Sequence, residues 1–205
     1  MMVRWLAVCG IVTPVADLLV TAGLAALDPR YSHSRQYISE LGAGGRPYAA
    51  LFNVWCVVYG LLFAGFAIGL GRGLRSRAVL VSLLAVAAAS AVAGVFPCDP
   101  GCAGSTPAAK IHILIGHVGA LAGVLAPVLS WAAMRGRPAW RGYETFSLAA
   151  GVLLLVATGW LAAGYYSGGG QRWCPVGVAQ RVLLAIQYGW MVVLAVRLWV
   201  LAGRA

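Results

Sequence analysis

The sequence is poor in charged side chains. Charged residues make up 10% of its 205 positions, whereas 61% of the residues are hydrophobic and the mean hydropathy is +0.86. A soluble domain of this length cannot hide so much apolar surface in a single core. The scarcity of charge therefore excludes an ordinary soluble globular protein and predicts that a lipid bilayer surrounds most of the chain.

Acidic residues are especially rare. Five Asp and Glu residues face fifteen Lys and Arg residues, which gives a formal net charge of +10. In a soluble domain this excess would suggest a nucleic-acid partner. Here the basic residues form short clusters between apolar runs rather than one exposed face, so we expect no nucleic-acid partner and attribute the clusters to membrane topology.

The apolar runs also lack the alternation of membrane β-strands, and backbone groups in lipid must be hydrogen-bonded within their own segment. We therefore predict an all-α fold. A hydrocarbon core about 30 Å thick needs about 20 apolar residues of helix. Six stretches reach that length, and we predict one transmembrane domain over residues 1–205 with helices at 5–27, 49–70, 78–96, 111–134, 146–166 and 176–201. The first run lacks a clean signal-peptide cleavage pattern and is expected to be retained.

Arginine clusters predict the orientation. Two short connections, 71–77 and 135–142, each carry three Arg residues, and the positive-inside rule places both in the cytoplasm. Both termini then lie in the cytoplasm, and the connections 28–48, 97–110 and 167–175 face outward. We expect a multi-pass protein of the bacterial cytoplasmic (inner) membrane.

The chain has no Cys-x-x-Cys motif and no second cysteine pair that would complete a zinc site, so we predict neither a redox motif nor a metal site. Three of its five cysteines, Cys98, Cys102 and Cys174, lie in the outward connections. If that space is oxidising, one disulfide and one free thiol are expected among these three, with the pairing open.

Small residues recur at helical spacing. Gly119 and Gly123 share one helix face, and Ala87, Ser90 and Gly94 share another. Such faces let helix backbones approach closely in lipid, where no hydrophobic force joins the helices. We predict that they serve helix packing.

Asp17 is an acid inside the first apolar run, on one stripe with Thr13 and Thr21. It lies about ten residues from either end, which is close to the midplane. An ionised, unpaired carboxyl there costs several kcal/mol, so Asp17 should face the bundle and be protonated or paired. Arg181 is the candidate partner. The acid can bind substrate, shuttle a proton or clamp the helix.

Two histidines open the fourth predicted helix. His112 and His117 are five residues apart, which separates their rings by about 140° and disfavours a shared metal. Either ring alone is more often a packing residue. His112, at the outer rim near Asp99 and Glu40, is also a candidate to act as general base or to complete a metal site.

The sequence of the connection 28–48 indicates local structure rather than a simple linker. Its Ser39-Glu40-Leu41 segment lies between an Asp-Pro turn and a glycine-rich break, which predicts a short helix across the outer mouth. Tyr31 and Tyr37 are expected at the membrane interface. The alternative is a simple amphipathic cap.

These residues give one hypothetical site near the outer face of the bilayer, in which an arginine binds a headgroup and an acid or histidine moves protons. The catalytic candidates are Asp17, Glu40, Asp99 and His112. The substrate-binding candidates are Arg181, Ser39, Asn53, His117 and Gln180. No motif indicates a cofactor.

The order of several short motifs resembles a bacterial six-helix membrane family catalogued as domain of unknown function nine-nine-eight. They are Asp17, Ile-Ser-Glu-Leu-Gly at 38–42, Asn53, Phe-Pro-x-Asp-Pro at 96–100, Ile-His at 111–112 and Gly-x-x-Gln-Arg at 177–181. The Ser-Glu-Leu-Gly segment is also similar to a loop of the Frag/DRAM/Sfk membrane family, some of whose members act in lipid remodelling. Gln180 stands where the bacterial family is expected to carry Glu. The resemblance implies a six-helix membrane fold and no settled activity.

Four functional classes remain open. The leading hypothesis is a lipid-binding or lipid-modifying protein whose partners are the bilayer and a lipid substrate. An isoprenoid cyclase that uses protonated Asp17 or Glu40 is the first alternative. A proton-coupled transporter is disfavoured because no internal repeat is visible. A non-catalytic subunit of a membrane complex is the fourth class.

Overall fold

The computed structural model describes residues 2–167 and 175–203, and these residues form six α-helices and three short 3-10 helices. The α-helices are α1 (Met2–Ala26), α2 (Ala49–Gly73), α3 (Arg77–Val95), α4 (Pro107–Met134), α5 (Tyr143–Tyr166) and α6 (Val176–Ala202). Each is long and apolar enough to cross a membrane. The predicted all-α, six-span membrane fold is confirmed.

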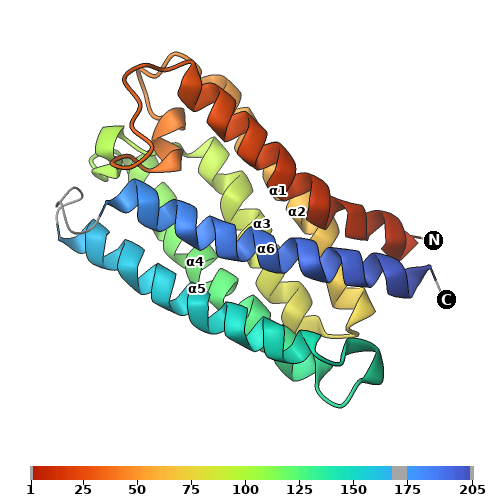
Figure 1. Cartoon of the computed structure of the whole chain (residues 1–205). Coiled ribbons are helices and arrows are strands. Elements are labelled where there is room, and N and C mark those ends of the chain that lie inside the picture. Colours follow the sequence, from red (N-terminus) through yellow and green to blue (C-terminus); the bar gives the residue numbers. More distant parts are fainter. Residues whose placement is uncertain (1, 168–174, 204–205) are drawn as a thin grey trace.

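The helices form a closed ring. Each packs against the next along the chain, and α6 returns to α1 (Figure 1). Both termini lie at one end of the bundle, which we call the terminal end. The opposite loop end carries the 3-10 helices η1 (Ile38–Gly42) and η2 (Pro100–Cys102), whereas η3 (Pro138–Trp140) joins α4 to α5 at the terminal end.

The helix ends differ from the predicted ones by a few residues because hydropathy marks the hydrocarbon layer rather than the helix. At its C-terminal end α2 runs on through Arg72 to Gly73. At its N-terminal end α4 begins at Pro107, four residues before the predicted start, because the Thr106 hydroxyl accepts a hydrogen bond from the Ala109 N–H and caps the helix.

Large apolar side chains cover the outside of the ring. Leu19, Leu61 and Val156 are 70%, 68% and 65% exposed. Scattered apolar residues are normal on soluble proteins, but all six helices expose them along their outer faces. Lipid is the solvent that such a surface requires.

The terminal half of the ring is filled with large side chains. Phe63, Phe66 and Trp190 are fully buried, and successive rings among them meet edge to face at centroid distances of 6.1 and 6.2 Å. The Trp190 indole N–H donates to the Ser147 hydroxyl at 3.1 Å. This hydrogen bond satisfies the polar atom of Trp190, and the open space lies nearer the loop end.

Glycines set the closest helix contacts. A Cβ on Gly94 of α3 would overlap the Asn53 carbonyl oxygen of α2, and one on Gly60 of α2 would lie 2.6 Å from the Ala87 carbonyl oxygen. A Cβ on Gly119 would lie 3.0 Å from the Ala89 methyl group. The predicted packing role is confirmed for Gly94 and Gly119.

Candidate functional site

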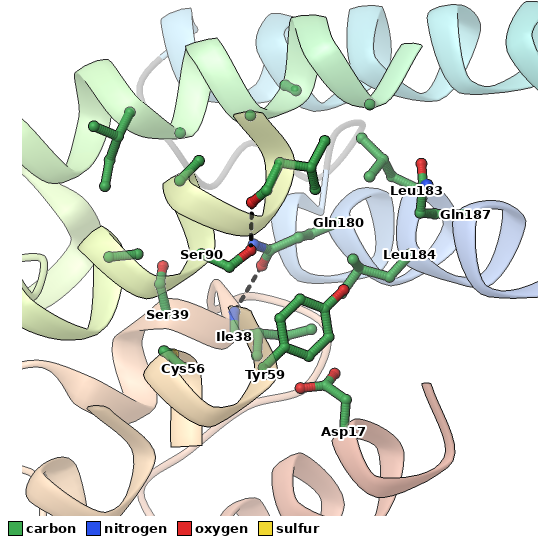
Figure 2. A pocket seen from close by; sticks show the side chains of 18 of the residues that line it. Asp17, Ile38, Ser39, Cys56, Tyr59, Ser90, Gln180, Leu183, Leu184 and Gln187 are labelled. Carbon is green, nitrogen blue, oxygen red and sulfur yellow. Dashed lines mark hydrogen bonds between the residues drawn. The ribbon is translucent and has the colours of Figure 1, made fainter. Parts of the chain in front are cut away.

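A cavity of about 280 Å³ lies inside the ring, in its loop half. All six α-helices and η1 contribute to its walls (Figure 2). The walls are mostly apolar, and their polar members are Asp17, Ser39, Cys56, Tyr59, Ser90, His112, Gln180, Gln187 and Tyr188.

Small residues create this space. The α3 and α4 walls are lined by Ala89, Ala93, Gly116, Gly119, Ala120 and Gly123. Gly123 was predicted to pack against another helix, but a Cβ there would meet only the Gln187 amide oxygen, at 3.5 Å across the cavity. The small face of α4 thus serves helix packing at Gly119 and leaves room for a ligand at Gly123.

Asp17 is 8% exposed and is held by two neutral donors. The Trp55 indole N–H donates to Oδ1 at 2.8 Å, and the Tyr188 hydroxyl donates to Oδ2 at 2.6 Å. Tyr59 in turn hydrogen-bonds to Tyr188. The predicted pairing with Arg181 is wrong, because no ion pair reaches Asp17 within residues 2–167 and 175–203.

Two glutamines of α6 face the same cavity with Leu183 and Leu184 between them (Figure 2). Gln180 Oε1 accepts a hydrogen bond from the Ile38 N–H at 2.7 Å, which fixes η1 against α6. Gln187 is 5% exposed, and its Nε2 has no hydrogen-bond partner within the part of the chain that the structure describes. An unsatisfied buried amide costs about 1–3 kcal/mol, so a ligand acceptor at this point would remove a penalty.

Glu40 ties the connection 28–48 to η2. It is 4% exposed and accepts hydrogen bonds from the Tyr37 N–H at 3.0 Å, the Gln36 amide at 2.9 Å and the Gly101 N–H at 3.1 Å. Arg46 lies 3.9 Å from its Oε2. The connection 28–48 and η2 together form a cap over the loop end. The oxygens of Glu40 are engaged within this cap, and Glu40 does not line the cavity.

Asp28 anchors the start of the same connection. Its carboxylate accepts from the Arg46 guanidinium at 3.0 Å and from the Arg30 backbone N–H at 3.1 Å. Burial alone would raise the pKa of Asp28, but these hydrogen bonds and the two positive charges outweigh it and hold the pKa below its ordinary value. Sequence reasoning missed both Asp28 and Arg46 as partners.

Arg181 fastens the connection to α6. Its guanidinium donates to the carbonyl oxygens of His33 and Gly177, and to the Tyr31 hydroxyl at 2.9 Å. Tyr31 and Tyr37 are 9% and 8% exposed, so the prediction that both lie in the membrane interface is wrong. Hydrogen bonding to Arg181 and to the Tyr37 carbonyl draws Tyr31 inward instead.

Asp99 and Asn53 hold loop backbone. Asp99 accepts from the Thr106 N–H at 2.9 Å and hydroxyl at 2.8 Å, and from the Ser105 N–H at 2.8 Å. The two Thr106 hydrogen bonds are the main reason that the pKa of Asp99 lies below its ordinary value. Asn53 donates to the Gly42 carbonyl at 3.1 Å, which fixes the end of η1 on α2.

The two histidines have separate surroundings. His112 lines the cavity, and its Nδ1 contacts the Phe96 carbonyl at 2.9 Å. Because a carbonyl only accepts, Nδ1 carries the hydrogen in this contact. His117 lies on the exposed face of α4, with Nδ1 at 2.7 Å from the Ile113 carbonyl and Nε2 at 3.1 Å from the Tyr166 hydroxyl.

Cys98 and Cys102 are buried neighbouring thiols at the loop end. Their mutual hydrogen bond lowers the pKa of Cys98 and raises that of Cys102. The Ser39 hydroxyl lies 3.4 Å from the Cys102 sulfur. Cys174 lies outside the described residues, so the predicted disulfide stays a prediction.

Four of the nine candidate residues meet at the cavity: Asp17, Ser39, His112 and Gln180. The other five lie outside its lining: Glu40, Asp99, Asn53, His117 and Arg181. Sequence reasoning missed Gln187, although it follows Gln180 by seven residues, two helical turns on the same face. It also missed Tyr59, and it did not link Trp55 to Asp17, because no sequence spacing joins the two residues.

A ring of six apolar helices around a polar-edged cavity defines the chain as a multi-pass integral membrane protein. The chain belongs to the family described as "Protein of unknown function (DUF998)", whose model matches residues 11–197. No curated protein and no solved structure matches the chain. The matched range contains Asp17, the cap and both cavity glutamines.

Proposed function

We propose that this protein binds an amphipathic, lipid-like molecule inside its helix ring, in the bacterial cytoplasmic membrane. The observation that carries the proposal is the combination of an apolar cavity, a carboxyl group fixed at its wall and a buried amide donor that has no partner among the described residues. Binding sites for small molecules have this character: apolar walls with a few placed polar groups.

The size of the cavity limits the ligand. About 280 Å³ lies near the lower end of small-molecule sites, which range from roughly 300 to 1,000 Å³. It suits a headgroup with a short apolar body, or one segment of an isoprenoid, rather than a whole phospholipid. The cap held by Glu40 and Arg181 covers the loop end and favours a ligand that is shielded from water.

Binding is favoured over cyclisation by the hydrogen bonds of Asp17. A cyclase that uses Asp17 as a Brønsted acid must direct its proton at the substrate, whereas both oxygens of Asp17 are already hydrogen-bonded to protein groups. Glu40, the other acid considered for this role, does not line the cavity. The proposal therefore rests on recognition rather than on a reaction.

The substitution Gly123→Leu tests the proposal. A Cβ at this position meets the Gln187 amide oxygen at the ordinary contact distance of 3.5 Å, so the leucine should fill the cavity without forcing the helices apart. The protein is purified in lipid nanodiscs, and bound molecules are identified by mass spectrometry. We expect a retained amphiphile in the wild-type protein and its loss in Gly123→Leu.

Gly189→Leu is the matched control, since Gly189 is exposed on α6 and a Cβ there meets nothing within 4 Å. It should retain the amphiphile as the wild type does. Equal retention by all three proteins would contradict binding inside the ring. A lipid-modifying activity would in addition alter the lipid composition of a strain that lacks the protein.

A further inference from the structure

We infer that the ligand carries a positively charged organic group, of the ammonium class, that pairs with Asp17, and a compact apolar body that fills the rest of the cavity. This inference rests on the proposed function and specifies the class of ligand.

Asp17 differs from the other two buried acids, Asp28 and Glu40. Asp28 and Glu40 have Arg46 at 3.0 and 3.9 Å, whereas Asp17 has only neutral donors within the described ranges. A carboxylate removed from water is unfavourable unless a cation or several hydrogen bonds compensate it. Two hydrogen bonds provide part of this compensation and leave the negative charge itself unpaired.

The neighbours of Asp17 hydrogen-bond to both of its oxygens and bring no charge. The Trp55 indole has a donor and no acceptor, so it cannot receive a proton from a carboxylic acid. The Tyr188 hydroxyl directs its hydrogen at Oδ2 and hydrogen-bonds to Tyr59 on its other side. A carboxylate has roughly four acceptor positions, and two are used, so the remaining capacity of Asp17 is open to the cavity that it lines.

The adjoining walls also suit an organic cation. Phe52 and Tyr59 line the cavity, and the faces of aromatic rings attract desolvated cations. Leu154, Leu161 and Leu183 provide apolar surface for the body of the ligand. The Nε2 of Gln187, which has no partner in residues 2–167 and 175–203, donates to an acceptor that the body carries.

Two probe molecules of the same shape, one cationic and one neutral, measure the contribution of the ligand's charge to binding. Benzyltrimethylammonium and neopentylbenzene differ by the replacement of one nitrogen cation with carbon. Binding of each isotopically labelled probe is measured by equilibrium dialysis on nanodiscs, with empty nanodiscs subtracted. We expect the cation to bind the wild-type protein at least tenfold more tightly than the neutral probe does.

Asp17→Asn should weaken binding of the cation at least tenfold and leave the neutral probe unchanged. Glu144→Gln is the matched control because it removes the same charge from the first turn of α5, away from the cavity lining. It should bind the cation as the wild type does. If Asp17→Asn fails to fold, the comparison of the two probes on wild-type protein still tests whether the cavity prefers a cation.

The same chemistry occurs in an amine lipid headgroup and in a free lipophilic amine. Nanodiscs of phosphatidylglycerol alone, compared with nanodiscs that also contain phosphatidylethanolamine, distinguish these sources. Weaker probe binding in the mixed nanodiscs indicates that the lipid amine competes for Asp17. Equal probe binding in both indicates a free amine.

The inference is overturned if the neutral probe binds as tightly as the cation, if Asp17→Asn binds the cation normally, or if neither probe binds. If the neutral probe binds and Gly123→Leu abolishes its binding, the cavity remains a binding site and the inferred charge alone is wrong. If neither probe binds and Gly123→Leu retains the same lipids as the wild type, both proposals fall.

Discussion

Single hydrogen bonds decide what the cavity presents to a ligand. Trp55 and Tyr188 approach Asp17 from positions 38 and 171 residues away in sequence, and both act as donors. Gln187 contributes an amide that is left without a partner among the described residues. Asp17 thus offers a carboxyl group, and Gln187 offers a donor, to the same cavity.

Tyr188→Phe should destabilise the protein by about 1–3 kcal/mol, because it removes a donor from buried Asp17 and a hydrogen-bond partner from Tyr59. Unfolding in mild detergent, followed by tryptophan fluorescence, measures the loss. Tyr166→Phe is the control, since Tyr166 is 72% exposed and its contact is with exposed His117. Equal stability of both variants would show that the Asp17 network is not formed.

Acid should loosen the cap. The pKa values of Asp28 and Asp99 lie below the ordinary value in the folded protein. The stability that these acids contribute is therefore present above about pH 4, the unfolded pKa, and is lost as the pH falls through the folded pKa. Thermal midpoints measured from pH 7 down to pH 3 should fall at the acid end.

Asp28→Asn should be less stable than the wild type at pH 7 and should lose less stability on acidification. A pH dependence identical to that of the wild type would contradict the role given to the Arg46 contact.

The sequence identified Asp17 because an acid in a long apolar run is conspicuous, and it identified Gln180 within a motif. It could not identify their partners. A phenol or an indole in a helix is more often a packing residue, and only the fold brings Trp55 and Tyr188 to Asp17. Arg181 was assigned to Asp17 on charge alone, whereas its guanidinium binds the carbonyl oxygens of His33 in the cap and Gly177 in α6.

At the scale of helices, small residues have two different uses. Gly60 and Gly94 bring α2 and α3 so close that an added Cβ would strike a backbone carbonyl, while Gly123 leaves space for the cavity. The spacing correctly predicted which helix faces carry small residues. It could not predict whether such a face contacts another helix or borders a cavity. That distinction depends on which residue of another helix lies opposite, and Gln187 lies opposite Gly123.

Gly94→Val should destabilise the protein by about 1–3 kcal/mol or more, because overpacking must displace the α2 backbone at Asn53. Thermal unfolding in detergent measures the change. Gly23→Val serves as control, since a Cβ on Gly23 meets nothing within 4 Å and the residue lies in the same kind of helix. Similar unfolding temperatures for the two variants would contradict the close α2–α3 contact.

At the scale of the whole molecule, apolar length predicted all six spans because the bilayer imposes one length on every helix. The closed ring was beyond prediction, since outward-facing apolar residues do not specify a neighbour. The terminal half of the ring is packed with aromatic side chains, whereas the cavity lies in its loop half. The cap covers the loop end of the bundle.

The Arg-rich connections predict that the terminal end lies in the cytoplasm. A green fluorescent protein fused after the last residue should therefore be fluorescent, whereas alkaline phosphatase at the same position should be inactive. Active phosphatase would reverse the orientation and place the cap and the cavity mouth on the cytoplasmic side.

The central claim is that a ligand occupies the space between Asp17 and Gln187. Cryo-electron microscopy of the protein in nanodiscs of its native lipids, with an antibody fragment bound to give it sufficient mass, tests this claim most directly. We predict density that does not belong to the chain, with a polar group against Asp17 and an apolar part along Leu183 and Leu184. A cavity that is filled by the protein's own side chains, with Asp17 paired to an arginine, would contradict the account.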